Sequence, residues 1–207
     1  MAPDPVDDAW LETCLIAIAK QGGSDMQFAA ITETVDIDEG DKDVEGIALT
    51  NGGRVMSWSP EGDTTVTFEA YPLQAGTEDS DTSATTGTGY SDLKHSADTA
   101  VPLRYINDRN RDLHRVLILW TNDTSVTTAQ SATAENKSAM RFGMCDAYCT
   151  SIKTAFTDGI LKYTVMFKSG AFDKSGAGNI LRESAAGTTT ADVLPAIAAY
   201  TSSNKFG

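Results

Sequence analysis

The stretch from Ile31 to Ala75 constrains the fold of this chain more than any other part of the sequence. Apolar and polar residues alternate along it with the two-residue period of a half-buried β-strand. Between two of these alternating runs, Asn51-Gly52-Gly53 supplies residues that tolerate the positive φ of a tight hairpin turn. We therefore predict four strands here, joined in order by an acidic turn, the tight turn and a further turn.

The remaining sequence predicts further strands and one helix. Val116–Trp120 is an apolar run typical of a buried strand, and Met140 begins an alternating run that continues towards Phe156. Asp158-Gly159 is a hairpin signal before a strand at Ile160–Lys168. Near the N-terminus, the spacing of Trp10, Cys14, Ala17 and Ile18 predicts an amphipathic helix over residues 7–20, ended by Gly22-Gly23.

These elements add up to eight or so strands and one helix. We predict a mainly β fold with one or two α-helices (α+β), an antiparallel sandwich or barrel in one domain spanning residues 1–207. Residues 76–100 are rich in Thr, Ser, Asp and Gly and have almost no large aliphatic side chains. Such a segment buries too little apolar surface to order by itself, so we expect a long loop insertion over residues 76–111.

The charge of the chain excludes a class of function. It carries 29 Asp and Glu against 16 Lys and Arg, a formal net charge of −13. A protein that grips DNA by its phosphates has the opposite sign. One basic patch stands out in this acidic sequence. We interpret its residues as partners that pair with acidic turns of the same or a neighbouring chain. Its members are Arg104, Arg109, Arg111, His114 and Arg115.

No catalytic, metal or cofactor site is predicted. The acidic turn from Asp36 to Glu45 does not match a calcium-binding EF-hand loop, because Gly40 and Asp41 stand one position out of place. The chain has three cysteines and two histidines in no ligand-like spacing, so we expect buried free thiols. No run of about 18 apolar residues could span a membrane, and the acidic N-terminus is unlike a signal peptide.

Three segments together resemble the tail tube proteins of tailed viruses, whose fold is shared with the inner tubes of contractile injection systems. The first is NGGRVMSW at residues 51–58, and the second is TTVTFEAYPLQAG at residues 64–76. The third and most specific is LKYTVMFKSGAFDKSGAGNI at residues 161–180. With the acidic hairpin before them, they cover about a third of the chain.

The resemblance implies a structural virion protein without catalytic residues. In that family, each subunit contributes a sheet to a continuous inner barrel of a hexameric ring, and the rings stack into a tube for genome passage. The implied partners are copies of the chain itself, other tail proteins (tape measure, terminator, and baseplate or tip) and viral DNA in transit without specific binding. The implied location is the virion tail, after synthesis in the host cytoplasm.

This interpretation gives candidate residues for two surfaces, the wall of the tube lumen and the contacts between subunits. Carboxylates on a tube wall suit DNA transit, since a basic wall would hold the phosphates. The candidates for the lumen are Glu33, Asp36, Asp38, Glu45 and Glu69. The candidates for contacts between subunits are Arg104, Arg109, Arg111 and Arg115.

A second class of function fits the same strand pattern. A soluble β-sandwich module that binds a sugar or a protein would use Trp58, Trp120 and Tyr90 as a binding platform. Asn122 and Asn136 begin N-glycosylation triplets, which need a secretory route to be used. An enzyme is the least favoured class, because no pair of acidic residues has a second identifying feature.

Overall fold

The computed structural model describes residues 13–23, 25–28, 31–41, 44–50, 52–58, 62–70, 112–123, 126–130, 138–185 and 194–207. These residues form ten β-strands and no helix. The strands are β1 (Thr13–Lys20), β2 (Asp25–Phe28), β3 (Ile31–Asp38), β4 (Val44–Ala48), β5 (Arg54–Trp58), β6 (Thr64–Ala70), β7 (His114–Thr121), β8 (Ala139–Thr157), β9 (Ile160–Ser169) and β10 (Ile180–Ala185). The mainly β, antiparallel fold class is therefore confirmed.

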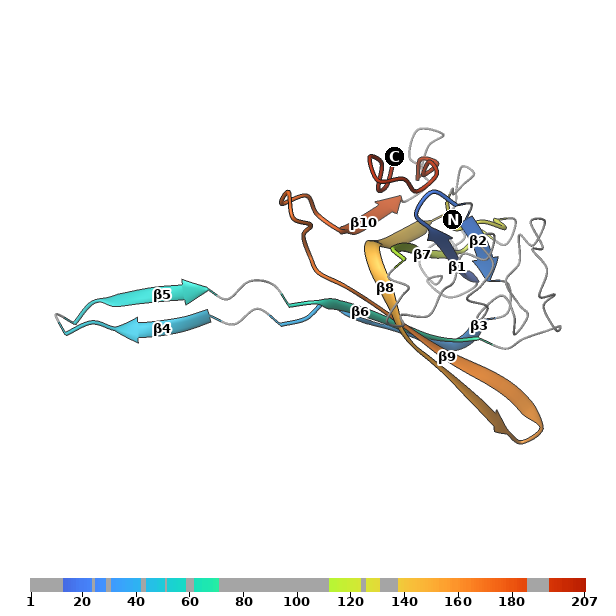
Figure 1. The fold of residues 1–207 in the computed structure, drawn as a ribbon, viewed down its shortest axis with the longest axis horizontal. Coiled ribbons are helices and arrows are strands. Elements are labelled where there is room, and N and C mark those ends of the chain that lie inside the picture. The colour runs from blue at the N-terminus through green and yellow to red at the C-terminus, as the bar shows by residue number, and fades with distance from the viewer. Residues whose placement is uncertain are drawn as a thin grey trace, which may run out of the picture.

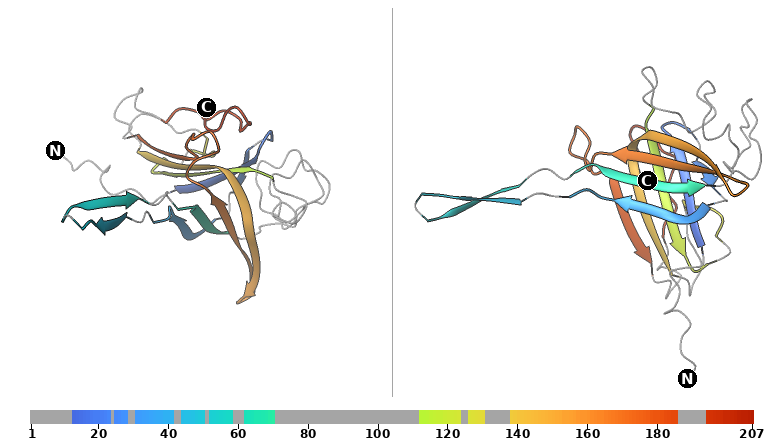
Figure 2. Two further views of the ribbon diagram at one scale, coloured as in Figure 1. Left: turned by 60° about the vertical axis from the view of Figure 1, so that its left-hand side comes forward. Right: turned by 90° about the horizontal axis from the view of Figure 1, so that it is seen from below.

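Eight strands form one sheet that β8 folds into two layers (Figures 1 and 2). The first half of β8 pairs with β7 and β10, and its second half pairs with β9. The first layer is therefore β2-β1-β7-β8 with β10 beyond β8, and the second is β3-β6-β9-β8. All of these pairings are antiparallel.

The main hydrophobic core lies between the two layers. Ile16, Ile18, Val116 and Ile118 enter it from the first layer. The second layer contributes Val66, Phe68, Tyr163, Val165 and Phe167, all fully buried. Phe68 and Phe167 stack with ring centroids 6.4 Å apart. The alternation read from the Ile31–Ala75 stretch is confirmed here, because Val35 and Ile37 pack against this core while Thr34, Asp36 and Asp38 are exposed.

The C-terminal segment, residues 194–207, covers the other face of the first layer. Leu194 and Ile197 pack on Leu117 and Leu119 of β7 in a second apolar cluster, with Phe206 against it. Gly143 of β8 leaves the space for the Phe206 ring, because a Cβ there would lie 2.7 Å from Phe206 Cε1. The first layer is thus buried on both faces.

Two buried arginines bind the C-terminal segment to the first layer. Arg115 Nη1 donates to the carbonyl oxygens of Ala198 (2.7 Å) and Lys205 (3.0 Å). Arg141 Nη2 donates to Pro195 O at 2.9 Å and also binds the Glu183 carboxylate on β10. Each guanidinium satisfies backbone carbonyls that would otherwise be costly to bury.

The helix predicted over residues 7–20 is wrong where the structure describes it. Residues 13–20 form β1, which pairs with β7 along its whole length and with β2. The two apolar layers explain the error, because Ile16 and Ile18 face the main core while Ala17 faces the second cluster. A short run that is apolar on both sides fits a doubly buried strand as well as one stripe of a helix.

The four predicted strands of the Ile31–Ala75 stretch form one long hairpin. β4 and β5 pair with each other, and β3 pairs with β6. β4 and β5 project from the body as an arm (Figure 1). At the root of the arm the two strands approach closely, since a Cβ on Gly40 (φ +73°) would lie 3.0 Å from the backbone of Gly62 and Asp63.

A second hairpin joins β8 to β9. Its turn is Asp158 (φ 56°) and Gly159 (φ 79°), flanked by the pair Thr157 and Ile160. Two positive-φ residues at the turn match the right-handed twist of the strands, so the hairpin predicted at Asp158-Gly159 is confirmed. Its tip extends past the body (Figure 1) and exposes Phe156 and Ile160.

Candidate functional site

The second layer turns a polar surface away from the core, and we call it the polar face. β3 contributes Asp36 and Asp38, which are exposed. Cross-strand rows extend from these residues over the sheet, and one row runs Asp36, Thr67, Met166, Ser151. The polar face consists of Thr34, Asp36, Asp38, Thr65, Thr67, Glu69, Ser151, Lys153, Lys162, Thr164, Met166 and Lys168.

The charges of the polar face are mixed. On the two interior strands, Lys162 Nζ lies 2.7 Å from Glu69 Oε1, and Lys168 Nζ lies 3.0 Å from Asp63 Oδ2. Lys153 stands on β8, and its row contains Thr164 and Glu69. The three lysines thus balance Asp36, Asp38 and Glu69, so the described part of the face is polar without being uniformly acidic.

Both margins of the second layer are open within the described part of the chain. β3 pairs there only with β6, and residues 148–157 of β8 pair only with β9. An open strand edge presents unpaired N–H and C=O groups to whatever lies next to it. The layer can therefore accept a further strand on either side.

The structure brings together three of the predicted lumen residues. Asp36, Asp38 and Glu69 share the polar face. Glu33 belongs to β3 and Glu45 to β4, and the orientations of these two side chains lie outside the described residues. Because β4 is on the arm, Glu45 stands apart from the other three (Figure 1).

Of the basic patch, His114 and Arg115 are described, and both are fully buried on β7. Arg104, Arg109 and Arg111 lie outside the described residues, as does the whole insertion predicted over residues 76–111. Arg115 is fully buried and pairs with its own chain. Its Nη2 donates to both Asp25 oxygens at 2.9 Å, and the guanidinium lies 5.7 Å from the centroid of the Tyr200 ring. This arginine joins β2, β7 and the C-terminal segment.

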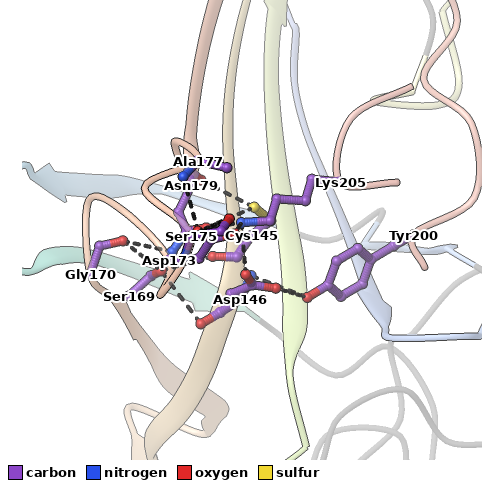
Figure 3. A network of polar contacts seen from close by, with 10 residues as sticks. All are labelled: Cys145, Asp146, Ser169, Gly170, Asp173, Ser175, Ala177, Asn179, Tyr200 and Lys205. Atoms are coloured by element: carbon purple, nitrogen blue, oxygen red, sulfur yellow. Dashed lines mark hydrogen bonds and ion pairs between the residues drawn. The ribbon is translucent and has the colours of Figure 1, made fainter. Parts of the chain in front are cut away.

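A polar cluster around Lys205 holds the end of the chain in place (Figure 3). Lys205 Nζ has three acceptors, Asp146 Oδ2 at 2.9 Å, Asp173 Oδ2 at 2.7 Å and Asn179 Oδ1 at 2.6 Å. Three acceptors satisfy the three N–H groups of an ammonium. Tyr200 donates its hydroxyl to Asp146 Oδ1 at 2.6 Å.

These contacts shift the titration of the cluster. The Lys205 ammonium, with donors from Ser175 and Ala177, holds the pKa of the Asp173 carboxyl well below its usual range. Burial alone would lower the pKa of Lys205, but its bonds to Asp173 and Asp146 raise it. Burial and the bond to Asp146 raise the pKa of Tyr200. At neutral pH these shifts keep Asp173 and Lys205 charged and keep the Tyr200 hydroxyl protonated as a donor.

The described residues lack the ligand groups that metal ions need. No group of three or more His, Cys, Asp or Glu there is placed to hold a metal ion. Cys145 and Cys149 are buried thiols, and Cys14 is half-buried. In the same part of the chain, no helix has the length and apolar character needed to cross a membrane. Trp120 of the alternative binding platform packs against the main core, and Tyr90 lies outside the described residues.

Sequence reasoning missed two features of this site. Lys153 is absent from the predicted site residues, and no alternation marks it, because Ile152 is buried while Lys153, Thr154 and Ala155 are all exposed. The C-terminal segment, residues 194–207, carries no motif that predicts its contact with the first layer. Its role depends on Arg115 and Arg141, which lie far from it in the sequence.

Comparison with known proteins gives structural likenesses only. No protein-family model matches the sequence, and no curated protein matches it. Among solved structures, the chain is similar to a chain of the sheath/tube terminator of an extracellular contractile injection system, PVC, in its extended state. That likeness has 13% identity and a TM-score of 0.44, and it covers 81% of this chain and 92% of the other.

Two further solved structures are similar to this chain. The tube-terminating cap of the anti-feeding prophage matches with 12% identity and a TM-score of 0.46, over 89% of this chain and all of the other (100%). An Hcp protein matches with 13% identity and a TM-score of 0.32, over 84% and 99% of the two chains. The neighbours thus include a tube-terminating cap and a sheath/tube terminator. At such identities and TM-scores, function has to come from this chain's own residues.

Proposed function

We propose that this protein is a structural subunit that closes into rings, and that the rings stack into a tube. The observation that carries the proposal is the second layer, a four-stranded antiparallel sheet with one apolar face, one polar face and two margins that no described strand covers. Such a sheet completes its backbone hydrogen bonds by joining a copy of itself. A head-to-tail contact of this kind closes a ring when the rotation between copies allows it.

The strand directions are compatible with this joining. β8, β9, β6 and β3 alternate in direction because each pairing is antiparallel. The β8 margin of one copy and the β3 margin of the next therefore run antiparallel to each other, and the alternation continues around the ring. In that ring the polar face lines the bore, while the first layer and the C-terminal segment lie outside. We propose six copies per ring.

The arm supplies a surface for stacking. Ile47, Leu49, Val55 and Met56 are each 43–52% exposed on or beside β4 and β5. A two-stranded hairpin with exposed apolar side chains is marginal in water by itself. We propose that it docks on a copy in the neighbouring ring. Tape-measure, terminator and baseplate or tip proteins of a virion tail would then bind the ends of the tube.

The proposed cargo is the viral genome. DNA passes a polar wall without being held, whereas a wall of lysines would bind its phosphates. Asp36, Asp38 and Glu69 would keep the described wall close to neutral against Lys153, Lys162 and Lys168. Replacing Thr67 and Glu69 of the interior strand β6 by Lys should allow rings to form but slow or stop genome delivery. Normal delivery by that variant would contradict the proposed role of the wall.

Electron microscopy of the purified chain tests the central proposal. Negative staining over a range of concentrations should show rings and stacked tubes, and light scattering should give a mass several times the 22.0 kDa of one chain. A proline at residue 153 or 154 should disrupt the sheet. Along β8, the N–H groups of consecutive residues point alternately towards β9 and towards the open margin. Because proline has no N–H group, one of the two variants disrupts the open margin and the other disrupts pairing with β9. A stable monomer under every condition would overturn the proposal.

A further inference from the structure

On the polar face, charged residues of the interior strands form ion pairs within the chain, whereas those of the edge strands form none with the described residues. The interior strands β6 and β9 carry Glu69, Lys162 and Lys168, and each pairs within the chain as described above. The edge strands carry Lys153 on β8 and Asp36 and Asp38 on β3. With none of the described residues does any of these three form an ion pair.

The two margins therefore carry opposite charges, unpaired by any described residue, on the same face of one sheet. We propose that Lys153 of one copy pairs with Asp36 and Asp38 of the next. We call this contact between the β8 margin of one copy and the β3 margin of the next the seam, and its charges favour β8-to-β3 joining over any other pairing of margins. The inference rests on the proposed ring. It adds the residues that decide which margins meet.

The register of the sheet places these side chains within reach of one another. Ser151 stands in the same cross-strand row as Asp36, through Met166 and Thr67. Lys153 is one side-chain step further along β8. Continued unchanged across the seam, these rows put Lys153 diagonal to Asp36, a separation that a long side chain spans. Strands in a barrel are staggered, and a stagger of two residues from Ser151 to Lys153 would bring Lys153 and Asp36 directly opposite.

The wrong pairings are penalised by the same charges. Two β3 margins placed together would bring four carboxylates side by side, and two β8 margins would bring two lysines together. Like charges opposite each other destabilise a strand pair, whereas opposite charges stabilise it. The seam therefore favours the head-to-tail contact that closes a ring over the symmetric contact that ends in a dimer.

Charge reversal at each margin tests the seam. Lys153→Glu makes both margins acidic, and Asp36→Lys with Asp38→Lys makes both basic. Either variant should need at least about a tenfold higher concentration for half-maximal ring formation, measured by light scattering and microscopy. Circular dichroism should show that both variants fold, because all three side chains are exposed. In urea, Lys153→Glu should unfold like the unchanged protein, and the double variant slightly earlier, because it loses the exposed hydrogen bond from Gly40 N to Asp38 Oδ1.

Mixing the two variants provides the decisive measurement. Every seam in an alternating ring joins an acidic margin to a basic one, so a 1:1 mixture should recover rings that contain both proteins in equal numbers. The triple variant with all three reversals should also recover rings alone. Lys168→Glu makes the same change of charge on an interior strand of the same face and should assemble like the unchanged protein.

The outcomes separate this inference from the proposed function. If the unchanged protein forms rings and the single-margin variants form them equally well, the seam is wrong and the ring stands. If the single-margin variants fail and neither the mixture nor the triple variant recovers, the loss is not electrostatic and the seam is again wrong. If the unchanged protein forms no rings, the proposed function itself fails.

Discussion

At the scale of single residues, burial raises the pKa of the three cysteine thiols and so lowers their reactivity. Burial raises the pKa of Cys14 to about 11, and it is the main cause that raises the pKa of Cys145 and Cys149 to about 12. The thiolate is the reactive form, and a pKa of about 11 leaves roughly one Cys14 in a thousand ionised at pH 8. We expect all three to react with a thiol reagent at least about a hundredfold more slowly than in denaturant.

Time courses with an aromatic disulfide reagent, with and without 6 M guanidinium, would check this. A fast reaction of one thiol in the folded protein would show that its site opens to solvent. Mass spectrometry would then identify whether that thiol is Cys14, the one that is only half-buried.

Asp173 gives a prediction about pH. Its folded pKa lies below the ordinary value, so its bond to Lys205 stabilises the fold fully above the unfolded pKa of about 3.9. That contribution is lost as pH falls from there through the folded pKa. The stability difference between the unchanged protein and Asp173→Asn should therefore be largest near pH 7 and shrink below pH 4. Urea unfolding at several pH values measures it, and a difference that grows in acid would contradict this account of the cluster.

At the scale of elements, the root of the arm depends on a glycine. Gly40 has φ +73° and stands 3.0 Å, measured from an ideal Cβ, from the Gly62 and Asp63 backbone. Gly40→Ala should destabilise the hairpin by about 1–3 kcal/mol, because it adds a left-handed non-glycine residue and a steric clash. Limited proteolysis of the arm would detect the change as faster cleavage.

Gly46→Ala on the arm is the matched control. A Cβ there meets only Met56 Sδ, at 3.6 Å, and φ is not positive. Equal effects of the two substitutions would mean that the arm root tolerates the added methyl group.

The elements also show which local patterns suffice for prediction. Asp158-Gly159 and the alternation around Val66 and Phe68 specify a turn and a strand through residues next to each other in sequence. Residues 13–20 do not, because a run that is apolar on both sides is compatible with two secondary structures. Pairing with β7 on one side and β2 on the other decides for the strand.

For the whole molecule, the C-terminal segment acts as the cover of the first layer. A variant ending at Thr201 loses Lys205, the centre of the polar cluster, and Phe206, which packs at Gly143. It also leaves Arg115 without one carbonyl partner. We expect a loss of about 2–4 kcal/mol in the free energy of unfolding, measured in urea, because a half-buried ring and a paired charge are removed together.

Faster labelling of Cys145 should accompany that loss, since its Sγ lies in the same cluster, 3.4 Å from Asn179 O. Removal of Gly207 alone is the control and should change little. Unchanged stability after truncation at Thr201 would mean that the segment is an appendage of the fold.

The sequence alone predicted which side of the strands most acidic residues of the candidate site occupy. The alternation along β3 and β6 placed Asp36, Asp38 and Glu69 on the polar side, because a strand's period of two is a local property. The sequence could not show that Lys153 stands at the opposite margin of the same sheet. That position depends on β9 lying between β8 and β6, a pairing across about a hundred residues of chain.

The sequence by itself determined where most strands begin and turn, and which side chains of the Ile31–Ala75 stretch face the core. The two-residue alternation of strands, turn residues and apolar runs all depend on residues that are close in sequence. They can therefore be recognised without knowing the fold. Tertiary structure decided that residues 13–20 are a strand, that β8 serves both layers, and that Arg115 is buried against the C-terminal segment. Each of these depends on desolvation and hydrogen-bond partners supplied by distant segments, which come together only when the chain has folded.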